Sequence, residues 1–175
     1  MFTVAENRNA TDKEEQMNKR QDFHTVRGYA LRSQNNHDLT PSMEDYLEMI
    51  FRLSEGQKPI RLNDLALALN VQPPSATKMV QRLAEAKYIN YEKYGAIELT
   101  GRGRNMGAKL LERHQTLENF FQLLGVKENL LKDTEKIEHS LSNETLDCIC
   151  LFVAFAKEYP EIIESLRQFV KMRKS

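Results

Sequence analysis

Two glutamates and a histidine share one helical face in the C-terminal half of the chain. Glu135, Glu138 and His139 stand at positions i, i+3 and i+4, which lie on the same side of an α-helix. Carboxylate oxygens and imidazole nitrogens together suit a hard or borderline divalent cation. Because these three residues alone are more typical of a solvated helix face than of a metal site, the interpretation depends on ligands elsewhere in the chain.

Three further residues could complete a metal site. Asp45 and Glu48 are spaced i, i+3 beside the apolar stripe of an earlier helix, and His114 lies among leucines of a later one. A single histidine beside an apolar face is usually a core residue that is satisfied by hydrogen bonds. Here it is one of six potential oxygen and nitrogen ligands on three helices, a pattern that indicates a metal site built between helices.

The elements that must position these ligands are mainly helical. Thr40 and Pro41 are typical of an N-cap and a first helical position, and apolar residues then recur at helical spacing to about Leu53. Two shorter helices follow, joined by a turn over 70–73, and the second opens at Pro74. Two helices joined by about four residues predict a helix-turn-helix.

A β-hairpin is expected directly after the helix-turn-helix. Apolar and polar residues alternate over 88–99, on both sides of a turn near Tyr94 and Gly95. This succession of elements predicts a winged helix, in which the hairpin is the wing.

The C-terminal half is expected to be entirely helical. A long helix runs from Arg104 to about Leu124, and three shorter helices start at the caps Asp133 and Ser142 and at Pro160. Their strongly apolar stretches suit the core of a dimer.

The predicted fold class is therefore mainly α with a small β-hairpin wing. Residues 1–39 are rich in polar and charged side chains and are interpreted as a flexible N-terminal extension. Residues 40–103 form the predicted winged helix-turn-helix DNA-binding domain, and residues 104–175 a helical metal-binding and dimerisation domain.

Charge is distributed unevenly along the chain. Lys and Arg number 25, as do Asp and Glu, so the formal net charge is zero, which argues against a general basic coat. Residues 61–110 nevertheless carry eight basic against four acidic side chains, as a local nucleic-acid-binding face would. There is no run of about 18 uncharged apolar residues and no secretory signal, so no membrane is expected and the predicted location is cytoplasmic.

The chain has two cysteines, Cys148 and Cys150. Two residues apart on a helix, they point to nearly opposite sides and cannot pair with each other. Two thiols without a disulfide framework fit a reducing compartment. Both are expected to be buried in the core or at an interface, with metal binding as the minor alternative.

Four stretches of the chain resemble the diphtheria toxin repressor family of metal-dependent transcriptional regulators, and within it the manganese transport regulators. The similarity extends over about Thr40 to Tyr159, and its most specific stretches are 40–46, 75–81, 91–94 and 137–139. The resemblance implies a repressor of metal-uptake genes with a two-metal site between helices that flank the DNA-binding unit. It carries the ligand roles onto Asp45, Glu48, His114, Glu135, Glu138 and His139.

Ligand softness indicates which metal such a site would take. Iron-responsive members of the family have a methionine and a cysteine at the positions that match Asp45 and Glu135. Carboxylates in place of sulfur donors favour Mn²⁺, while Fe²⁺, Co²⁺, Zn²⁺ or Cd²⁺ could bind in vitro. The resemblance implies two Mn²⁺ per subunit, and Glu118, one turn after His114, is a candidate partner outside the ligand set.

The third helix and the wing are expected to contact double-stranded DNA. Serine and glutamine can contact base edges in the major groove, and lysine and arginine can bind phosphates. In a homodimer, two such helices could match successive major grooves about 34 Å apart, as on a palindromic operator. The predicted DNA-binding residues are Pro74, Ser75, Thr77, Lys78, Gln81, Arg82, Lys93 and Tyr94.

The predicted function is that of a manganese-dependent repressor in which metal fixes the dimer for DNA binding by tying the first helix to the C-terminal domain. An iron- or zinc-responsive regulator of the same family is the nearest alternative. A di-metal helical enzyme is less favoured, since such bundles usually present Glu-x-x-His twice. No small-molecule substrate and no catalytic residues are predicted. A winged helix that binds only protein is disfavoured by the basic residues over 61–110.

Overall fold

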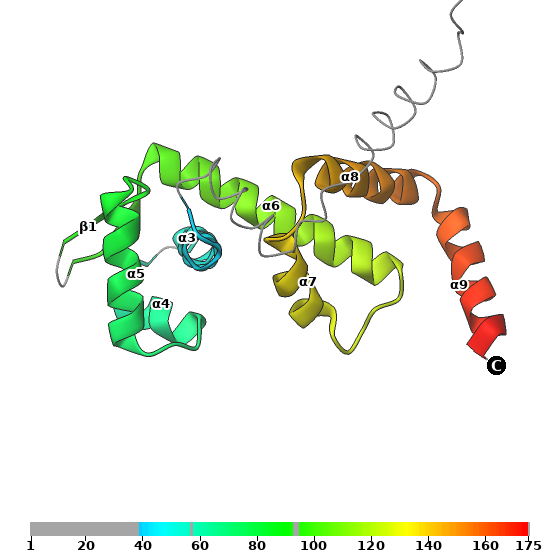
Figure 1. Cartoon of the computed structure of the whole chain (residues 1–175), viewed down its shortest axis with the longest axis horizontal. Coiled ribbons are helices and arrows are strands. Elements are labelled where there is room, and N and C mark those ends of the chain that lie inside the picture. Colours follow the sequence, from blue (N-terminus) through cyan, green and yellow to red (C-terminus); the bar gives the residue numbers. More distant parts are fainter. Residues whose placement is uncertain (1–38, 57, 93–94, 175) are drawn as a thin grey trace, which may run out of the picture. The chain divides into compact units, whose positions relative to one another are not determined.

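A computed structural model of the chain describes residues 39–56, 58–92 and 95–174. Within these ranges it has seven α-helices and one two-stranded antiparallel sheet (Figure 1). The predicted fold class, mainly α with a hairpin wing, is confirmed. The elements are α3 (Pro41–Ser54), α4 (Leu62–Ala68), α5 (Pro73–Glu85), β1 (Ile89–Tyr91), β2 (Ile97–Leu99), α6 (Gly101–Leu123), α7 (Leu130–Glu138), α8 (Asn143–Glu158) and α9 (Pro160–Lys174).

The first described helix begins where its capping residues predict. Thr40 is the N-cap of α3, its hydroxyl accepts a hydrogen bond from the backbone N–H of Met43 at 3.4 Å, and Pro41 is the first helical residue. Leu39, which its polar sequence neighbours place in the predicted flexible extension, is only 4% exposed and belongs to the hydrophobic core. The rest of the predicted extension, residues 1–38, lies outside the described residues.

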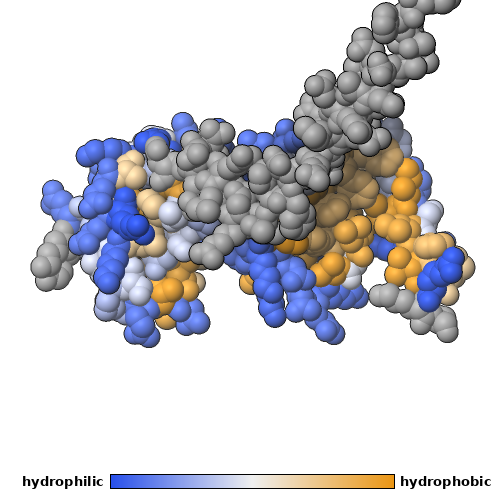
Figure 2. Space-filling model, in the orientation of Figure 1, coloured by the Kyte–Doolittle hydropathy of each residue, from blue (hydrophilic) through white to orange (hydrophobic). Residues whose placement is uncertain are grey.

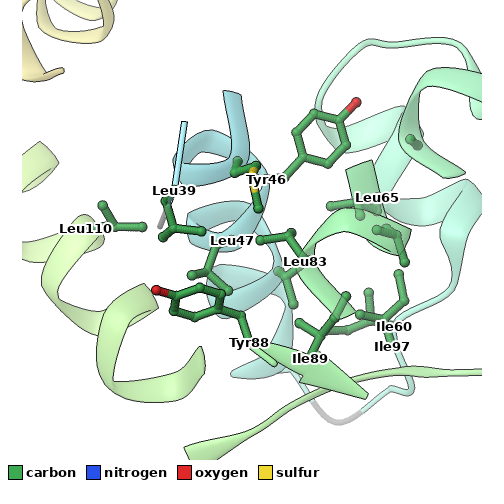
Figure 3. Close-up of a cluster of buried hydrophobic side chains, with 14 of the residues drawn as sticks. Leu39, Tyr46, Leu47, Ile60, Leu65, Leu83, Tyr88, Ile89, Ile97 and Leu110 are labelled. Atoms are coloured by element: carbon green, nitrogen blue, oxygen red, sulfur yellow. The ribbon is translucent and has the colours of Figure 1, made fainter. Parts of the chain in front are cut away.

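Helices α4 and α5 form the expected helix-turn-helix. Asn70, in the turn between them, has a φ of 52°, a left-handed conformation that asparagine tolerates better than most residues. Helix α5 begins at Pro73 and not at Pro74, because either proline can occupy a first-turn position that needs no N–H donor. The apolar faces of these two helices meet α3 and the hairpin in one core, which Figure 3 shows, with Leu65 and Leu83 fully buried.

The two strands of the wing pair Ile89 with Leu99 and Tyr91 with Ile97. Ile97 also donates its backbone N–H to the carbonyl of Ile60 at 2.9 Å, which attaches the hairpin to the segment before α4. The predicted DNA contacts Lys93 and Tyr94 lie outside the described residues.

Helix α6 connects the wing to the C-terminal helices (Figure 1). It starts at Gly101, three residues before the predicted Arg104, because Thr100 caps it by accepting the N–H of Gly103 at 3.0 Å. Two glycines allow close packing along this helix. A Cβ at Gly103 would lie 1.8 Å from the backbone oxygen of Tyr88, and a Cβ at Gly107 would lie 2.6 Å from Cβ of Phe51.

Helices α7 and α8 pack against α6, and α9 packs against α8. Ser142 caps α8 and Pro160 opens α9, as predicted. Asp133 does not cap α7: its N–H donates to the carbonyl of Asn129 at 2.9 Å, so Asp133 already lies within the first turn and Asn129 takes the cap position. Helix α7 thus begins at Leu130, before the acidic residue that the sequence indicates as its cap.

Both cysteines lie on helix α8. Cys148 and Cys150 are both exposed in the single chain, so the prediction of a buried core position is wrong for both. The alternative, that they lie at an interface, stays a prediction. None of the described helices has the length and apolar character needed to cross a bilayer.

Candidate metal centre

The structure brings five of the six predicted ligands, from three helices, into two close groups. The sixth, Glu135, lies outside both groups, with its Oε1 3.9 Å from Nδ1 of His114. Helix α3 supplies Asp45 and Glu48, α6 supplies His114, and α7 with its C-cap supplies the other three. Ligand atoms of Asp45, Glu138 and His139 all lie within 4.8 Å of one another. The same holds for ligand atoms of Glu48, His114 and Glu138. Glu138 belongs to both groups.

Glu138 lies between the two histidines. Its Oε2 is 3.1 Å from Nδ1 of His114, and its Oε1 is 3.6 Å from Nε2 of His139. The side chain is only 2% exposed. A buried carboxylate is stable only with partners, and here each oxygen faces an imidazole nitrogen. The arrangement is that of a carboxylate able to bridge two cations.

His139 is enclosed by carboxylates. Its Nε2 lies 2.7 Å from Oδ1 of Asp45. Burial acts to lower the pKa of His139, but hydrogen bonds with Asp45 and Glu44 and the charges of Asp45 and Glu138 outweigh burial and raise the pKa to about 10. Both ring nitrogens are therefore protonated at neutral pH, and the ring is cationic, while no metal ion is bound.

Carboxylates also lie close to His114 and Glu135. His114 Nδ1 is 3.9 Å from Oε1 of Glu135 and 4.0 Å from Oε1 of Glu48. The hydrogen bond with Glu138 raises the pKa of His114, against an opposing effect of burial. Burial raises the pKa of Glu135, and the charge of Glu138 raises it further. The charge of Glu138 thus favours the protonated form of both groups, and a bound cation would relieve the same repulsion.

These residues fit a pair of divalent cations. Four carboxylates and two imidazoles are hard and borderline donors without sulfur, and four carboxylate charges equal the charge of two divalent ions. A cavity of about 920 Å³ borders the cluster, lined among others by Asp45, Glu48, His114, Glu118 and Glu135. Without metal, Arg52 supplies part of the balancing charge, since its guanidinium donates to Oε1 of Glu48 at 2.6 and 2.9 Å.

Two residues that were not predicted from the sequence, Glu44 and Arg113, support the ligands. Glu44 Oε2 accepts hydrogen bonds from Nη2 of Arg113 at 2.7 Å and from Nδ1 of His139 at 2.8 Å. Burial raises the pKa of Glu44, but these hydrogen bonds outweigh burial and the net pKa is lowered. Glu44 directly precedes the predicted ligand Asp45, and Arg113 directly precedes His114. This adjacency was the only feature of the sequence that could have indicated their role. Glu118 lines the cavity and accepts a hydrogen bond from Gln122 at 3.5 Å; within the described residues it has no hydrogen bond or ion pair with any of the six predicted ligands.

The predicted DNA-contacting residues of α5 lie on one side of that helix. Most of them are exposed, whereas Ala76, Val80 and Leu83 on the opposite side are buried. Thr77 is half-buried, and its hydroxyl donates to the carbonyl of Pro73 at 2.9 Å, so it is occupied within the helix. The exposed residues are Pro74, Ser75, Lys78, Gln81 and Arg82.

The fold and the ligand cluster together define a class of protein. A winged helix-turn-helix presents a polar recognition helix, and its first helix supplies ligands to a metal centre shared with a helical C-terminal region. That combination is a DNA-binding regulator whose activity responds to a metal ion.

Comparison with known proteins identifies the family. Residues 38–97 match the iron-dependent repressor N-terminal DNA-binding domain, and residues 100–167 match the iron-dependent repressor metal-binding and dimerisation domain. The chain belongs to the iron-dependent repressor family. The prediction of a DNA-binding transcriptional repressor that binds a divalent metal and dimerises is confirmed at this level, as is the prediction that it is not an enzyme.

Individual relatives are similar over most of the described chain. The HTH-type transcriptional regulator MntR of Geobacillus kaustophilus is 46% identical over 133 residues, which cover 75% of this chain and 94% of that protein. MntR of Listeria welshimeri is 45% identical over 129 residues, 73% of this chain and 91% of that protein.

Solved structures share the fold over a smaller part of their length. The manganese regulator SloR superposes with a TM-score of 0.59 at 26% identity, over 67% of this chain and 55% of that one. A manganese-dependent transcriptional repressor in complex with manganese gives 0.59 at 28% identity, over 65% and 53%. This chain therefore spans about half the length of those structures.

Proposed function

We propose that the chain is a manganese-dependent transcriptional repressor of metal-uptake genes, with two Mn²⁺ per subunit as corepressor. The observation that carries the proposal is the position of Glu138, a buried carboxylate whose oxygens face both histidines and which belongs to both ligand groups. Manganese is favoured over softer ions because all six ligand atoms are oxygen or nitrogen. The similarity to manganese-responsive regulators supports the same choice.

The ligand positions explain how a metal would act on the DNA-binding unit. Bound cations would neutralise the clustered carboxylates and hold them together. Asp45 and Glu48 belong to α3, which packs in the core of the winged helix, whereas Glu135, Glu138 and His139 belong to the C-terminal region. Holding these residues together restricts motion between the two regions, so the separation of two recognition helices in a dimer is restricted as well.

The C-terminal helices offer the surface for dimerisation. Figure 2 shows hydrophobic residues gathered over the region of α8 and α9. A monomer that exposed such a patch would be unusual, and the match to a dimerisation domain extends to residue 167, so it covers α8 and the first half of α9. The exposed apolar side chains there are Leu151, Phe155, Tyr159, Ile162, Phe169 and Met172.

In the dimer, α5 of each subunit would enter one major groove of a palindromic operator. Ser75 and Gln81 would contact base edges, and Lys78 and Arg82 phosphates. Pro74 would bring the N-terminus of α5 close to the DNA backbone, and Thr77 would contact it through its methyl group. Lys93 and Tyr94 of the wing remain part of this proposal from the sequence alone.

Fluorescence anisotropy with DNA from the protein's own promoter region tests the proposal. Wild-type protein is titrated in chelator and then with Mn²⁺, Fe²⁺ and Zn²⁺ separately, beside Glu135→Ala and the control Glu112→Ala, which alters an exposed carboxylate of α6. We expect tight binding with Mn²⁺ in wild type and the control, and its loss in Glu135→Ala. Equal binding in chelator, or a response to Fe²⁺ or Zn²⁺ but not to Mn²⁺, would contradict the proposal.

A further inference from the structure

Two consecutive residues of α3 hold the ring of His139 from both sides. Glu44 Oε2 lies 2.8 Å from Nδ1, and Asp45 Oδ1 lies 2.7 Å from Nε2. Asp45 is a proposed ligand, whereas Glu44 faces the nitrogen that points away from the ligand cluster. The orientation of the imidazole is thus determined by α3, although His139 itself ends α7.

Hydrogen bonding at Nδ1 determines which nitrogen is available to a metal. A carboxylate can only accept, so Nδ1 must carry the proton that it donates to Glu44. Nε2 is then the nitrogen that can lose its proton and bind a cation. A carboxylate that holds the second nitrogen of a ligating histidine fixes its tautomer and orientation and raises its basicity.

Arg113 in turn holds Glu44. Its Nη2 donates to Oε2 of Glu44 at 2.7 Å and lies 3.3 Å from Nδ1 of His139. Arg113 and His139 therefore both donate to Oε2 of Glu44. The side chains of Arg113 and Glu44 are 20% and 13% exposed. Because this pair is neutral as a whole, it adds no net charge to four carboxylates that already equal two divalent cations. Without Arg113, Glu44 would be a fifth carboxylate charge beside the centre.

We propose that Glu44 and Arg113 are positioning residues of the metal centre, which present Nε2 of His139 to the ion bound with Asp45 and Glu138. This inference rests on the proposed metal-dependent function, and it assigns roles to two residues that bind no metal themselves. It also links α6 to the centre at a second point besides His114, since Arg113 and His114 are adjacent in α6. Removal of such a partner typically weakens metal binding by about 10–100-fold.

Direct metal binding by the full chain tests the role. Free Mn²⁺ is followed by electron paramagnetic resonance in titrations of wild type, Glu44→Gln, Arg113→Gln and Arg113→Lys, with Glu112→Gln as the control. Visible absorption of Co²⁺-loaded protein reports ligand geometry, and melting of the metal-free protein reports folding. We expect Glu44→Gln and Arg113→Gln to weaken Mn²⁺ binding by about 10–100-fold and to change the Co²⁺ spectrum. Arg113→Lys should recover part of the affinity, and the control should match wild type.

The outcomes separate this inference from the proposed function. If wild type binds Mn²⁺ but Glu44→Gln stays within twofold of its affinity with an unchanged Co²⁺ spectrum, the positioning role is overturned and the repressor function stands. If Glu44→Gln melts early, the comparison of Arg113→Lys with Arg113→Gln decides, and equal affinities for these two overturn the role. If wild type itself binds DNA equally in chelator, the proposed function fails independently.

Discussion

Oε2 of Glu138 lies 3.1 Å from Nδ1 of His114, in a pair whose side chains are only 2% and 5% exposed. The pair joins α7 to α6, and the other oxygen of the same carboxylate faces His139. No other ligand in the described part of the chain belongs to both candidate metal groups. Loss of this one charge should therefore affect the whole centre.

Glu138→Gln keeps the volume of the side chain and removes its charge. We expect no Mn²⁺ binding at concentrations that saturate wild type, because both ligand groups lose their shared anion. In the metal-free protein the pKa of His114 should fall, since the hydrogen bond with Glu138 is the largest cause of its elevation. Calorimetric titration measures the first effect and NMR titration of His114 the second. Asp45→Asn, which alters one group, should leave part of the binding, and equal loss in both variants would contradict the shared role.

Metal binding should release protons. The pKa of His139 is raised to about 10 in the metal-free state, so the ring is cationic at pH 7, and an imidazole must give up a proton to bind a cation. Mn²⁺ affinity should therefore increase with pH up to about 10. Calorimetry in buffers of different ionisation enthalpy counts the protons, and release of none at pH 7 would contradict the expectation.

The same elevated pKa has the opposite consequence for the metal-free fold. A raised folded-state pKa stabilises the fold fully below the unfolded value of 6.5, and this contribution is lost as pH rises through about 10. The free energy of unfolding in chelator should thus fall between those values, by less in Asp45→Asn than in wild type. Urea denaturation at a series of pH values measures the change.

Arg52 should compete with metal for Glu48. Its guanidinium donates twice to Oε1 of that ligand, at 2.6 and 2.9 Å, but the Arg52 side chain is 39% exposed. Helical ion pairs of this spacing contribute about 0.3–0.5 kcal/mol, so Arg52→Met should tighten Mn²⁺ binding by about twofold. Arg52→Lys, which retains the charge, should stay near wild type. Weaker binding by Arg52→Met would show that the arginine orients Glu48 for the metal.

Gly107→Ala should force α3 and α6 apart. The added Cβ would lie 2.6 Å from Cβ of Phe51, within the packed interface of the two helices. Overpacking of this kind costs about 1–3 kcal/mol, which urea denaturation can measure. Gly101→Ala is the matched control on the same helix, because a Cβ there has no atom within 4 Å. Equal stability of the two variants would mean that the interface adjusts freely.

Local signals in the sequence account for most of the fold. Thr40 and Ser142 satisfy helix N-termini by their own hydroxyls, so the start of each helix can be recognised from neighbouring residues. That Glu135, Glu138 and His139 share one side of α7 and its C-cap could be predicted, because helical spacing alone puts them on one face; their role as ligands stays a prediction. The prediction of Asp133 as a helix cap was wrong. Residues that favour the cap position are common in the sequence, and only the backbone shows which one occupies it.

Contacts between distant residues could not be predicted in this way. Glu44 and Arg113 are 69 positions apart, and only the packing of α3 on α6 brings them together. Leu39 is buried by the same kind of tertiary contact, although its neighbours in sequence are polar. The exposure of Cys148 and Cys150 likewise depends on which face of α8 meets α6, and this face cannot be deduced from a helix that is apolar on several sides.

Helix α6 contacts the wing through Gly103, α3 through Gly107, and the metal ligands through His114. All three contacts lie on one uninterrupted helix, so their angular relation is determined by the number of residues between them. One residue inserted between Gly107 and His114 would rotate the imidazole by about 100° and turn it away from the carboxylates. Four inserted residues would restore the direction approximately but move the ligand by about 6 Å along the axis. The seven-residue spacing from Gly107 to His114 therefore sets the direction of the ligand relative to the contact with α3. An insertion or deletion in this segment would disturb either the packing of the DNA-binding region or the metal centre.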